Sequence, residues 1–300
     1  MVSLYTTKSS NLRRSVFLIT GFLVFVILFG WLLSSQTGND IYLYVAVVYA
    51  IGSSLVSYFY SDKIVLGMYR AQPVTMQTNP ELYRIVENLS ITTGIPMPKL
   101  YIVSDPAPNA FATGRNYQHA AVAVTSGLLG RLDKSELEGV LAHELSHVIN
   151  RDTLVSTIVV ILVSVVATAS NLFLRSLYFS NMSNGRDRDR GNLSQVLFIL
   201  TIVGALLAPF AAVLIQLAVS RRREFLADSN GALITRYPEG LANALIKISQ
   251  SPVQLQHINN QTAHLWFDNP FKGKAKTTWF YKLFMTHPPV EERVKALLGK

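Results

Sequence analysis

Four long apolar runs divide the 300-residue chain. They cover residues 16–33, 41–60, 154–174 and 196–219, and none of them contains Asp, Glu, Lys or Arg. An α-helix rises about 1.5 Å per residue, so about 18 or more apolar residues can cross the roughly 30 Å hydrocarbon core of a bilayer. The pattern therefore predicts four membrane-spanning helices arranged as two hairpins. For the last two runs the alternative is a hairpin buried in a soluble core, but their length favours spanning.

Basic residues flank the first run on one side only. Lys8, Arg13 and Arg14 precede it, whereas the loop of residues 34–40 that follows contains no Lys or Arg. Because Lys and Arg accumulate on the cytoplasmic side of membrane helices, the N-terminus and the two polar segments are expected in the cytoplasm. The sequence GRDRDRG between the last two runs opposes this orientation, since its aspartates count little against its three arginines.

The polar segments follow the periodicities of soluble helices and strands. We therefore divide the chain into a first transmembrane hairpin, the first part of a cytoplasmic domain, a second transmembrane hairpin and the second part of that domain. These four parts are residues 1–61, 62–153, 154–219 and 220–300.

Local signals in the first cytoplasmic part predict both helices and strands. Asn79 and Gly94 bracket a stretch with apolar residues at helical spacing. Asp133 and Glu136 form a capping-box pattern at the start of a second helix. The sequences KLYIV, AFAT and HAAVAVT have the composition of short strands. This mixture predicts an α+β domain.

Composition narrows the possible chemistry. The chain has no cysteine, which excludes disulfides, thiolate metal sites and cysteine nucleophiles. Its net charge is +9, but the basic residues border the apolar runs and no nucleic-acid-binding motif is present. We therefore expect no nucleic-acid partner, and we expect Arg221, Arg222 and Arg223, directly after the last run, to contact anionic lipid.

The stretch HELSH carries the most specific chemical signal. Residues four apart lie on one face of a helix, so His143 and His147 can bind one metal ion together. Glu144 follows His143 and can reach a water on that ion. This is the H-E-x-x-H pattern of zinc peptidases, in which the histidines bind zinc and the glutamate is the general base. The alternative is a pair of surface histidines on an amphipathic helix.

A catalytic zinc site usually has a third protein ligand. The other four histidines lie far from HELSH in sequence, so Glu224, which directly follows the last run, is the better candidate. The second hairpin would leave the membrane surface near His147 and return there near Glu224. Asp228, one turn further on, could accept the N–H of a zinc-bound imidazole. The alternative for Glu224 is a charge paired with the neighbouring arginines.

Several motifs, in this order, resemble the HtpX family of bacterial membrane zinc endopeptidases, relatives of the eukaryotic CAAX-prenyl proteases. They are NAFATGR, AVAVTSGLL, HELSH, EFLAD and THPPVEERV, which together span nearly the whole chain. The resemblance implies one zinc ion bound by His143, His147 and Glu224, catalysis by Glu144, and a role in quality control of membrane proteins. It implies a multi-pass protein of the bacterial plasma membrane whose catalytic domain faces the cytoplasm. Its substrates would be misfolded membrane proteins or unfolded polypeptides.

The fold class expected is therefore an α-helical polytopic membrane protein with four transmembrane helices and a cytoplasmic α+β, zincin-like metalloprotease domain built from two chain segments. The tetrahedral oxyanion of the reaction needs a donor beside zinc. His287, in its HPP context, is the first candidate, and Asn109 and Arg293 are weaker ones that could also serve substrate binding. Ala121 and Ala123 lie in a strand that is expected either at a sheet edge, where it could pair with an extended substrate, or in the core.

Three other functions are compatible with parts of the pattern. An intramembrane protease would place H-E-x-x-H inside a span, but polar residues surround the motif here. A zinc transporter would need ionisable ligands inside the spans, and the four runs contain none. A membrane scaffold with an accidental motif is the third, and a zinc measurement would separate it from an enzyme.

Overall fold

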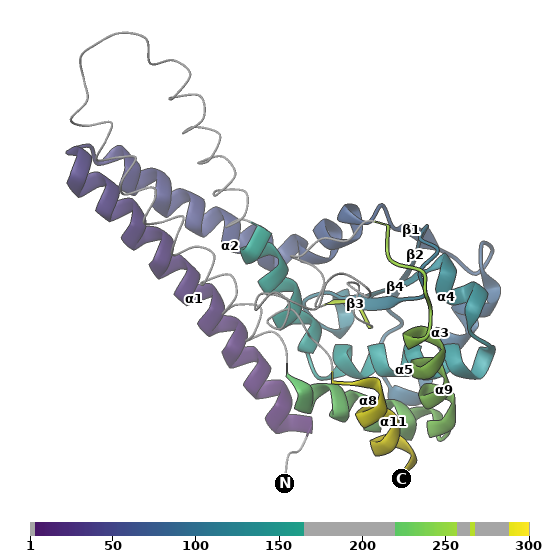
Figure 1. Cartoon of the computed structure of the whole chain (residues 1–300). Helices are drawn as coiled ribbons and strands as arrows, with labels where there is room; N and C mark the ends of the chain where they lie inside the picture. Colours follow the sequence, from purple (N-terminus) through teal and green to yellow (C-terminus); the bar gives the residue numbers. More distant parts are fainter. Residues whose placement is uncertain (1–3, 165–219, 257–264, 268–287, 300) are drawn as a thin grey trace.

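The computed structural model describes residues 4–164, 220–256, 265–267 and 288–299. Two long antiparallel helices project from a domain that contains a mixed sheet and several shorter helices (Figure 1). The fourth apolar run, the end of the third, the loop GRDRDRG and His287 lie outside the described residues.

The first two apolar runs form the projecting hairpin, as predicted. It consists of α1 (Leu4–Thr37) and α2 (Ile41–Met68), and each contains a stretch long and apolar enough to cross a membrane. The helices approach closely at Gly30, where an added Cβ would lie 2.2 Å from the Cβ of Ala46. Large apolar side chains of α2 point outward, as they would toward lipid: Ile41, Tyr44, Val45, Val48, Ile51, Leu55 and Phe59.

The third apolar run begins inside the protein. The helix Asp152–Ser164 follows the histidine-bearing helix after a bend of 81°. Its residues Leu154, Ile158 and Leu162 are buried in one cluster with Leu18 and Phe22 of α1. Two helices are therefore candidate spans, or three if the bent pair forms one, among the residues that the structure describes.

Four strands form one mixed sheet in the order β1-β2-β4-β3. The strands are β1 (Gln72–Val74), β2 (Lys99–Val103), β3 (Ala110–Thr113) and β4 (Ala121–Thr125). Strand β4 is parallel to β2 and antiparallel to β3. Of the two positions expected for the strand in residues 119–125, the core is therefore correct and the edge is wrong, because β4 is paired on both sides. In the described sheet, β1 and β3 occupy the two edges.

The two faces of the sheet have different partners. Ala110, Ala112, Val122 and Val124 belong to the main core, which the helices α3 and α5 also enter. Phe111, Ala121 and Ala123 belong to a second cluster with Trp266 and the end of α2. The helices of the domain are α3 (Pro80–Thr93), α4 (Ser126–Arg131), α5 (Lys134–Ile149), α8 (Arg221–Thr235), α9 (Pro238–Ser249) and α11 (Val290–Leu298), together with the 3-10 turn η1 (Tyr117–His119).

The predicted helix caps are present. The side chain of Asn79 accepts a hydrogen bond from the Leu82 amide at 3.0 Å, and Gly94 ends α3 in a left-handed conformation. At the start of α5, Asp133 accepts from the Glu136 amide while the Glu136 side chain accepts from the Asp133 amide. Such caps stabilise a helix by about 1 kcal/mol each. The capping box thereby fixes where α5 begins, which in turn fixes the register of its histidines.

Candidate metal centre

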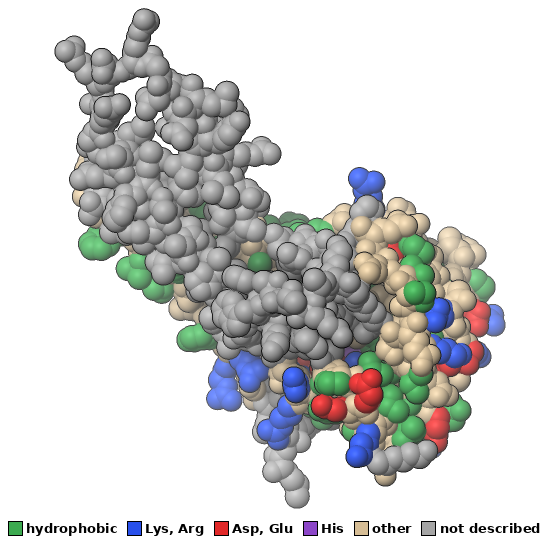
Figure 2. Space-filling model, in the orientation of Figure 1, with side chains coloured by type: hydrophobic (Ala, Val, Ile, Leu, Met, Phe, Trp, Pro, Cys, Tyr) green, Lys and Arg blue, Asp and Glu red, His purple; other side chains and the backbone are tan. Residues whose placement is uncertain are grey.

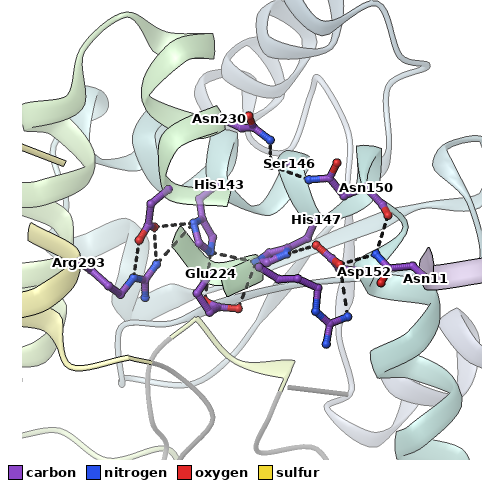
Figure 3. A network of polar contacts seen from close by, with 11 residues as sticks. Asn11, His143, Ser146, His147, Asn150, Asp152, Glu224, Asn230 and Arg293 are labelled. Atoms are coloured by element: carbon purple, nitrogen blue, oxygen red, sulfur yellow. Dashed lines mark hydrogen bonds and ion pairs between the residues drawn. The ribbon is translucent and has the colours of Figure 1, made fainter. Parts of the chain in front are cut away.

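Three side chains from two helices converge on one point. His143 and His147 lie on the same face of α5, with their Nε2 atoms 3.1 Å apart. Glu224, in the first turn of α8, places Oε2 3.8 Å from Nε2 of His143 and Oε1 3.6 Å from Nε2 of His147. Figure 3 shows these three side chains turned toward one another. They form a group of potential ligands that could hold a metal ion.

Close packing of α8 on α5 brings Glu224 to the histidines. A Cβ added to Gly231 would lie 3.1 Å from the His143 amide nitrogen, so a larger residue would push the helices apart. One turn of α5 away, the side chain of Asn230 donates a hydrogen bond to Ser146 Oγ at 3.1 Å. A glycine contact and a polar contact therefore set the distance between the two helices that supply the ligands.

Asp228 is expected to pair with one of the two imidazoles, and in the structure its partner is His143. Its Oδ1 lies 2.9 Å from Nδ1 of His143, which leaves Nε2 directed toward His147 and Glu224. Arg293 of α11 donates two hydrogen bonds to the same carboxylate, at 2.6 and 2.8 Å. The sequence suggests Arg293 as a substrate-binding or oxyanion-stabilising group, but it is 1 % exposed and is paired with Asp228. Its position indicates that it orients the Asp228–His143 pair.

Asp152 plays the corresponding part for His147, a role that is not predicted from the sequence. Its Oδ2 lies 3.0 Å from Nδ1 of His147. Its Oδ1 accepts a hydrogen bond from Nη1 of Arg223 at 3.4 Å. Arg223 is buried, so the expectation that it contacts lipid is wrong, whereas Arg221 and Arg222 are exposed. Each histidine therefore has one ring nitrogen paired with a carboxylate and the other turned toward the common point.

The electrostatics differ between the two histidines. Burial lowers the pKa of His143 to about 4, with Asp228 opposing part of this effect. Burial also acts to lower the pKa of His147, but the hydrogen bond to Asp152 and the charges of Glu224, Asp152 and Glu144 outweigh it and raise the pKa to about 9. Burial acts to raise the pKa of Asp228, yet Arg293 and His143 bring it down to about 2. The concentrated negative charge around the histidines suits a cation.

Glu144 lies in the same buried environment. It follows His143 on α5, is 3 % exposed, and is close enough for its charge to act on His147. Its carboxylate therefore lies near the three potential metal ligands but is not one of them.

The remaining candidate residues have other roles or lie elsewhere. The Asn109 side chain accepts a hydrogen bond from the Ala110 amide at 3.0 Å and is buried at the start of β3. Ala121 and Ala123 are buried on the central strand β4, which gives their side chains no access to a substrate. His119 is exposed and contacts Arg115, and it is not part of the group of potential metal ligands.

Removing the guanidinium of Arg293 should destabilise the domain strongly. An Arg293→Ala variant leaves the Asp228 carboxylate buried without its bidentate partner, and breaking a buried ion pair in this way costs about 3–5 kcal/mol. The free energy of unfolding, measured by denaturant titration of the metal-free protein, should fall by that amount. Glu292→Ala, an exposed charge on the same helix, is the control and should change it by less than about 0.5 kcal/mol.

These features define a membrane-bound metalloendopeptidase: two histidines four apart on one helix, a glutamate from a second helix, an adjoining mixed sheet and a membrane hairpin. Comparison with known proteins identifies the peptidase family. The model of peptidase family M48 matches residues 76–300, and the chain belongs to this family.

Curated relatives place it among the HtpX proteases. A Protease HtpX homolog of Tropheryma whipplei (strain Twist) is 50 % identical over 269 residues, covering 90 % of this chain and 89 % of that protein. A Protease HtpX homolog of Pyrococcus furiosus is 46 % identical over 281 residues, covering 93 % and 91 %. Both relatives match over nearly their whole length, so the resemblance seen in the motifs is confirmed.

A solved structure shares the fold. The crystal structure of S. mikatae Ste24p matches 99 % of this chain and 67 % of its own, with a TM-score of 0.51 and 18 % identity. At this low identity the likeness concerns the fold alone.

Proposed function

We propose that the protein is a zinc-dependent endopeptidase of the bacterial plasma membrane, which hydrolyses peptide bonds of misfolded or damaged membrane proteins on the cytoplasmic side. The observation that carries the proposal is the meeting of His143, His147 and Glu224 beside the carboxylate of Glu144.

The donor set fits zinc. Two imidazole nitrogens and one carboxylate are a usual ligand combination for catalytic zinc, with a fourth position left for water. Tetrahedral bonds of about 2.0–2.1 Å place ligand atoms about 3.3 Å apart. The two Nε2 atoms are 3.1 Å apart, and each lies 3.6–3.8 Å from one of the two carboxylate oxygens of Glu224, which is around that value. Carboxylates behind both histidines hold each ring with Nε2 directed at the common point, which is the orientation that a zinc ion requires.

Each residue then has a defined part in hydrolysis. Zinc, when bound, makes water acidic near neutral pH and polarises the scissile carbonyl. Glu144 accepts the proton of the attacking water and delivers it to the departing amine. Asp228 and Asp152 keep Nε2 of His143 and His147 directed at the metal position. His287 is the proposed hydrogen-bond donor to the oxyanion that forms from the scissile carbonyl.

Strand β3 replaces β4 as the proposed site of substrate pairing. The Thr125 amide donates to the Asn109 carbonyl, so in the alternating antiparallel pattern Ala110 and Ala112 direct their amides and carbonyls away from β4. The Ala110 carbonyl on this outer edge accepts a hydrogen bond from the Phe267 amide at 2.9 Å. Pairing of this kind selects an extended backbone over particular side chains, which suits a protease that removes damaged proteins.

The activity test is metal removal and return. Full-length protein in detergent should contain about one zinc ion per chain and cleave casein, as three-ligand sites allow. A chelator such as 1,10-phenanthroline should abolish cleavage, and added zinc should restore it. A protein that keeps its activity after complete removal of metal would contradict the proposal.

The proposed orientation is tested with reporter fusions. Reporters after Asp40 and within residues 184–191 should be external, and one after Lys300 should be cytoplasmic. The exposed Arg221 and Arg222, like Arg13 and Arg14 of α1, would then lie at the cytoplasmic surface and contact anionic lipid. Figure 2 shows Lys and Arg side chains near the end of the hairpin that meets the domain. A cytoplasmic reporter within 184–191 would mean that the last two apolar runs enter the membrane without crossing it.

A further inference from the structure

One polar side chain of the first membrane helix reaches the metal centre. Asn11 of α1 is 1 % exposed. Its Nδ2 donates a hydrogen bond to Oδ1 of Asp152 at 2.7 Å and another to the carbonyl of Asn150 at 2.9 Å (Figure 3). Its sequence neighbours Leu12, Arg13 and Arg14 are exposed, so Asn11 lies on the face of α1 that turns toward the domain.

The carboxylate that Asn11 contacts is the one that holds a potential metal ligand. Oδ2 of Asp152 lies 3.0 Å from Nδ1 of His147, while Oδ1 accepts the hydrogen bond from Asn11. The other donor to Oδ1, Arg223, is further away, at 3.4 Å. Because a carboxylate is planar, fixing Oδ1 also fixes the direction of Oδ2. Asn11 thereby restricts the orientation of the His147 ring.

The second hydrogen bond of Asn11 secures the bend beside the site. α5 ends at Ile149, Asn150 follows, and Arg151 has a positive φ of 58°, which is uncommon for a residue other than glycine. The chain then turns by 81° into the helix that begins at Asp152. A strained backbone of this kind persists only where its surroundings hold it. By bonding the Asn150 carbonyl, Asn11 helps to hold the turn that presents Asp152 to His147.

We propose that Asn11 is a positioning residue of the metal centre, so that the first membrane helix is part of the machinery that binds the metal. The inference rests on the proposed zinc site. Its consequence is that zinc affinity depends on α1 being seated against the helix Asp152–Ser164, where Leu18 and Phe22 continue the same contact. A protein whose first helix is displaced would keep its three ligands but bind zinc more weakly.

The test is a zinc-affinity measurement on full-length variants in detergent, by competition with a chromophoric chelator. Asn11→Ala should weaken zinc binding by roughly 10- to 100-fold, as changes behind a metal-bound histidine do. Ser15→Ala is the matched control, because Ser15 is buried one turn along α1 and its hydroxyl donates to the Asn11 carbonyl of the same helix. Ser15→Ala should bind zinc like the wild type.

A double-mutant cycle separates positioning from general destabilisation. If Asn11 acts through Asp152, Asn11→Ala should have little further effect on zinc affinity in an Asp152→Ala background. Equal and additive losses would overturn the inference, as would wild-type affinity in Asn11→Ala. Zinc binding by the wild type itself tests the underlying proposal: if the wild type and Glu144→Gln both bind no zinc, the proposed function fails.

A second measurement needs no variant of Asn11, in case that variant does not fold. Coupling between two sites is reciprocal, so zinc should stabilise the seating of α1 as much as α1 strengthens zinc binding. Hydrogen exchange of amides in residues 9–15 should slow when zinc is added to the wild type. The same addition to Asp152→Ala, at zinc concentrations that saturate it, should slow them less. Exchange in α1 that is unaffected by zinc in both proteins would contradict the inference.

Discussion

Replacing Glu144 with glutamine should lower the rate of casein cleavage by roughly 10²–10⁴-fold, the usual contribution of a general base. Glutamine preserves the size of the side chain but removes the carboxylate that accepts the proton. Because Glu144 is not among the grouped ligands, zinc content should remain at the wild-type level. Turnover and metal content, measured on the same preparation, therefore separate proton transfer from metal binding.

Glu138→Gln is the matched control for this prediction. Glu138 lies on the same helix, is partly exposed, and has no position in the group of ligands. Its variant should keep full activity. The wild type should also cut itself once detergent releases it from the membrane, whereas Glu144→Gln should purify intact. Near-normal proteolysis by a zinc-loaded Glu144→Gln would show that another group moves the proton.

Features set by neighbouring residues could be predicted from the sequence. The helical repeat places His143 and His147 on one face, and Asp133 and Glu136 indicate where that helix begins. Asp228 could be placed behind one of the two imidazoles because it follows Glu224 by one turn of the same helix, but its pairing with His143 and not His147 could not be predicted. In each case the relevant partners lie within a few residues of one another, and helix geometry alone relates them.

Features set by packing between distant segments could not be predicted in this way. The Asn11–Asp152 bond joins residues 141 apart, and the Arg293–Asp228 pair joins residues 65 apart. In the sequence, these polar residues cannot be told apart from exposed ones, because a buried pair of distant polar residues leaves no local pattern. The order of the strands is a similar case: alternation in residues 121–125 identifies a strand but not its neighbours. The expectation that Arg223 contacts lipid is wrong for the same reason, since Arg223 is buried and pairs with Asp152, 71 residues away.

The bend between α5 and the next helix lets one short stretch of chain serve both the metal site and the contact with α1. His147 belongs to α5 inside the domain, whereas Leu154 already packs against α1. The six residues between them include the left-handed Arg151 and the carboxylate of Asp152. The metal centre is thereby adjacent to α1, although its potential ligands belong to α5 and α8 and not to the hairpin of α1 and α2.

Removing Glu224 should have the largest effect on metal binding. Glu224→Ala takes away one of three protein ligands, so zinc affinity should fall by more than roughly 100-fold, the upper end of what changes behind a ligand cause. The packing of α8 on α5 at Gly231 and Asn230 does not involve this side chain, so the fold should survive. Equilibrium dialysis against zinc measures the affinity directly.

Thermal unfolding distinguishes a lost ligand from a damaged fold. A ligand at about 100 times its dissociation constant stabilises the native state by about 2.7 kcal/mol, so zinc should raise the melting temperature of the wild type. For Glu224→Ala, the metal-free melting temperature should be close to that of the wild type, and the same zinc concentration should raise it little. Glu239→Ala, an exposed carboxylate at the start of α9, should respond to zinc as the wild type does. If Glu224→Ala instead keeps full zinc content and full activity, the third ligand must come from elsewhere, and His257, His264 and His287 become the residues to replace next.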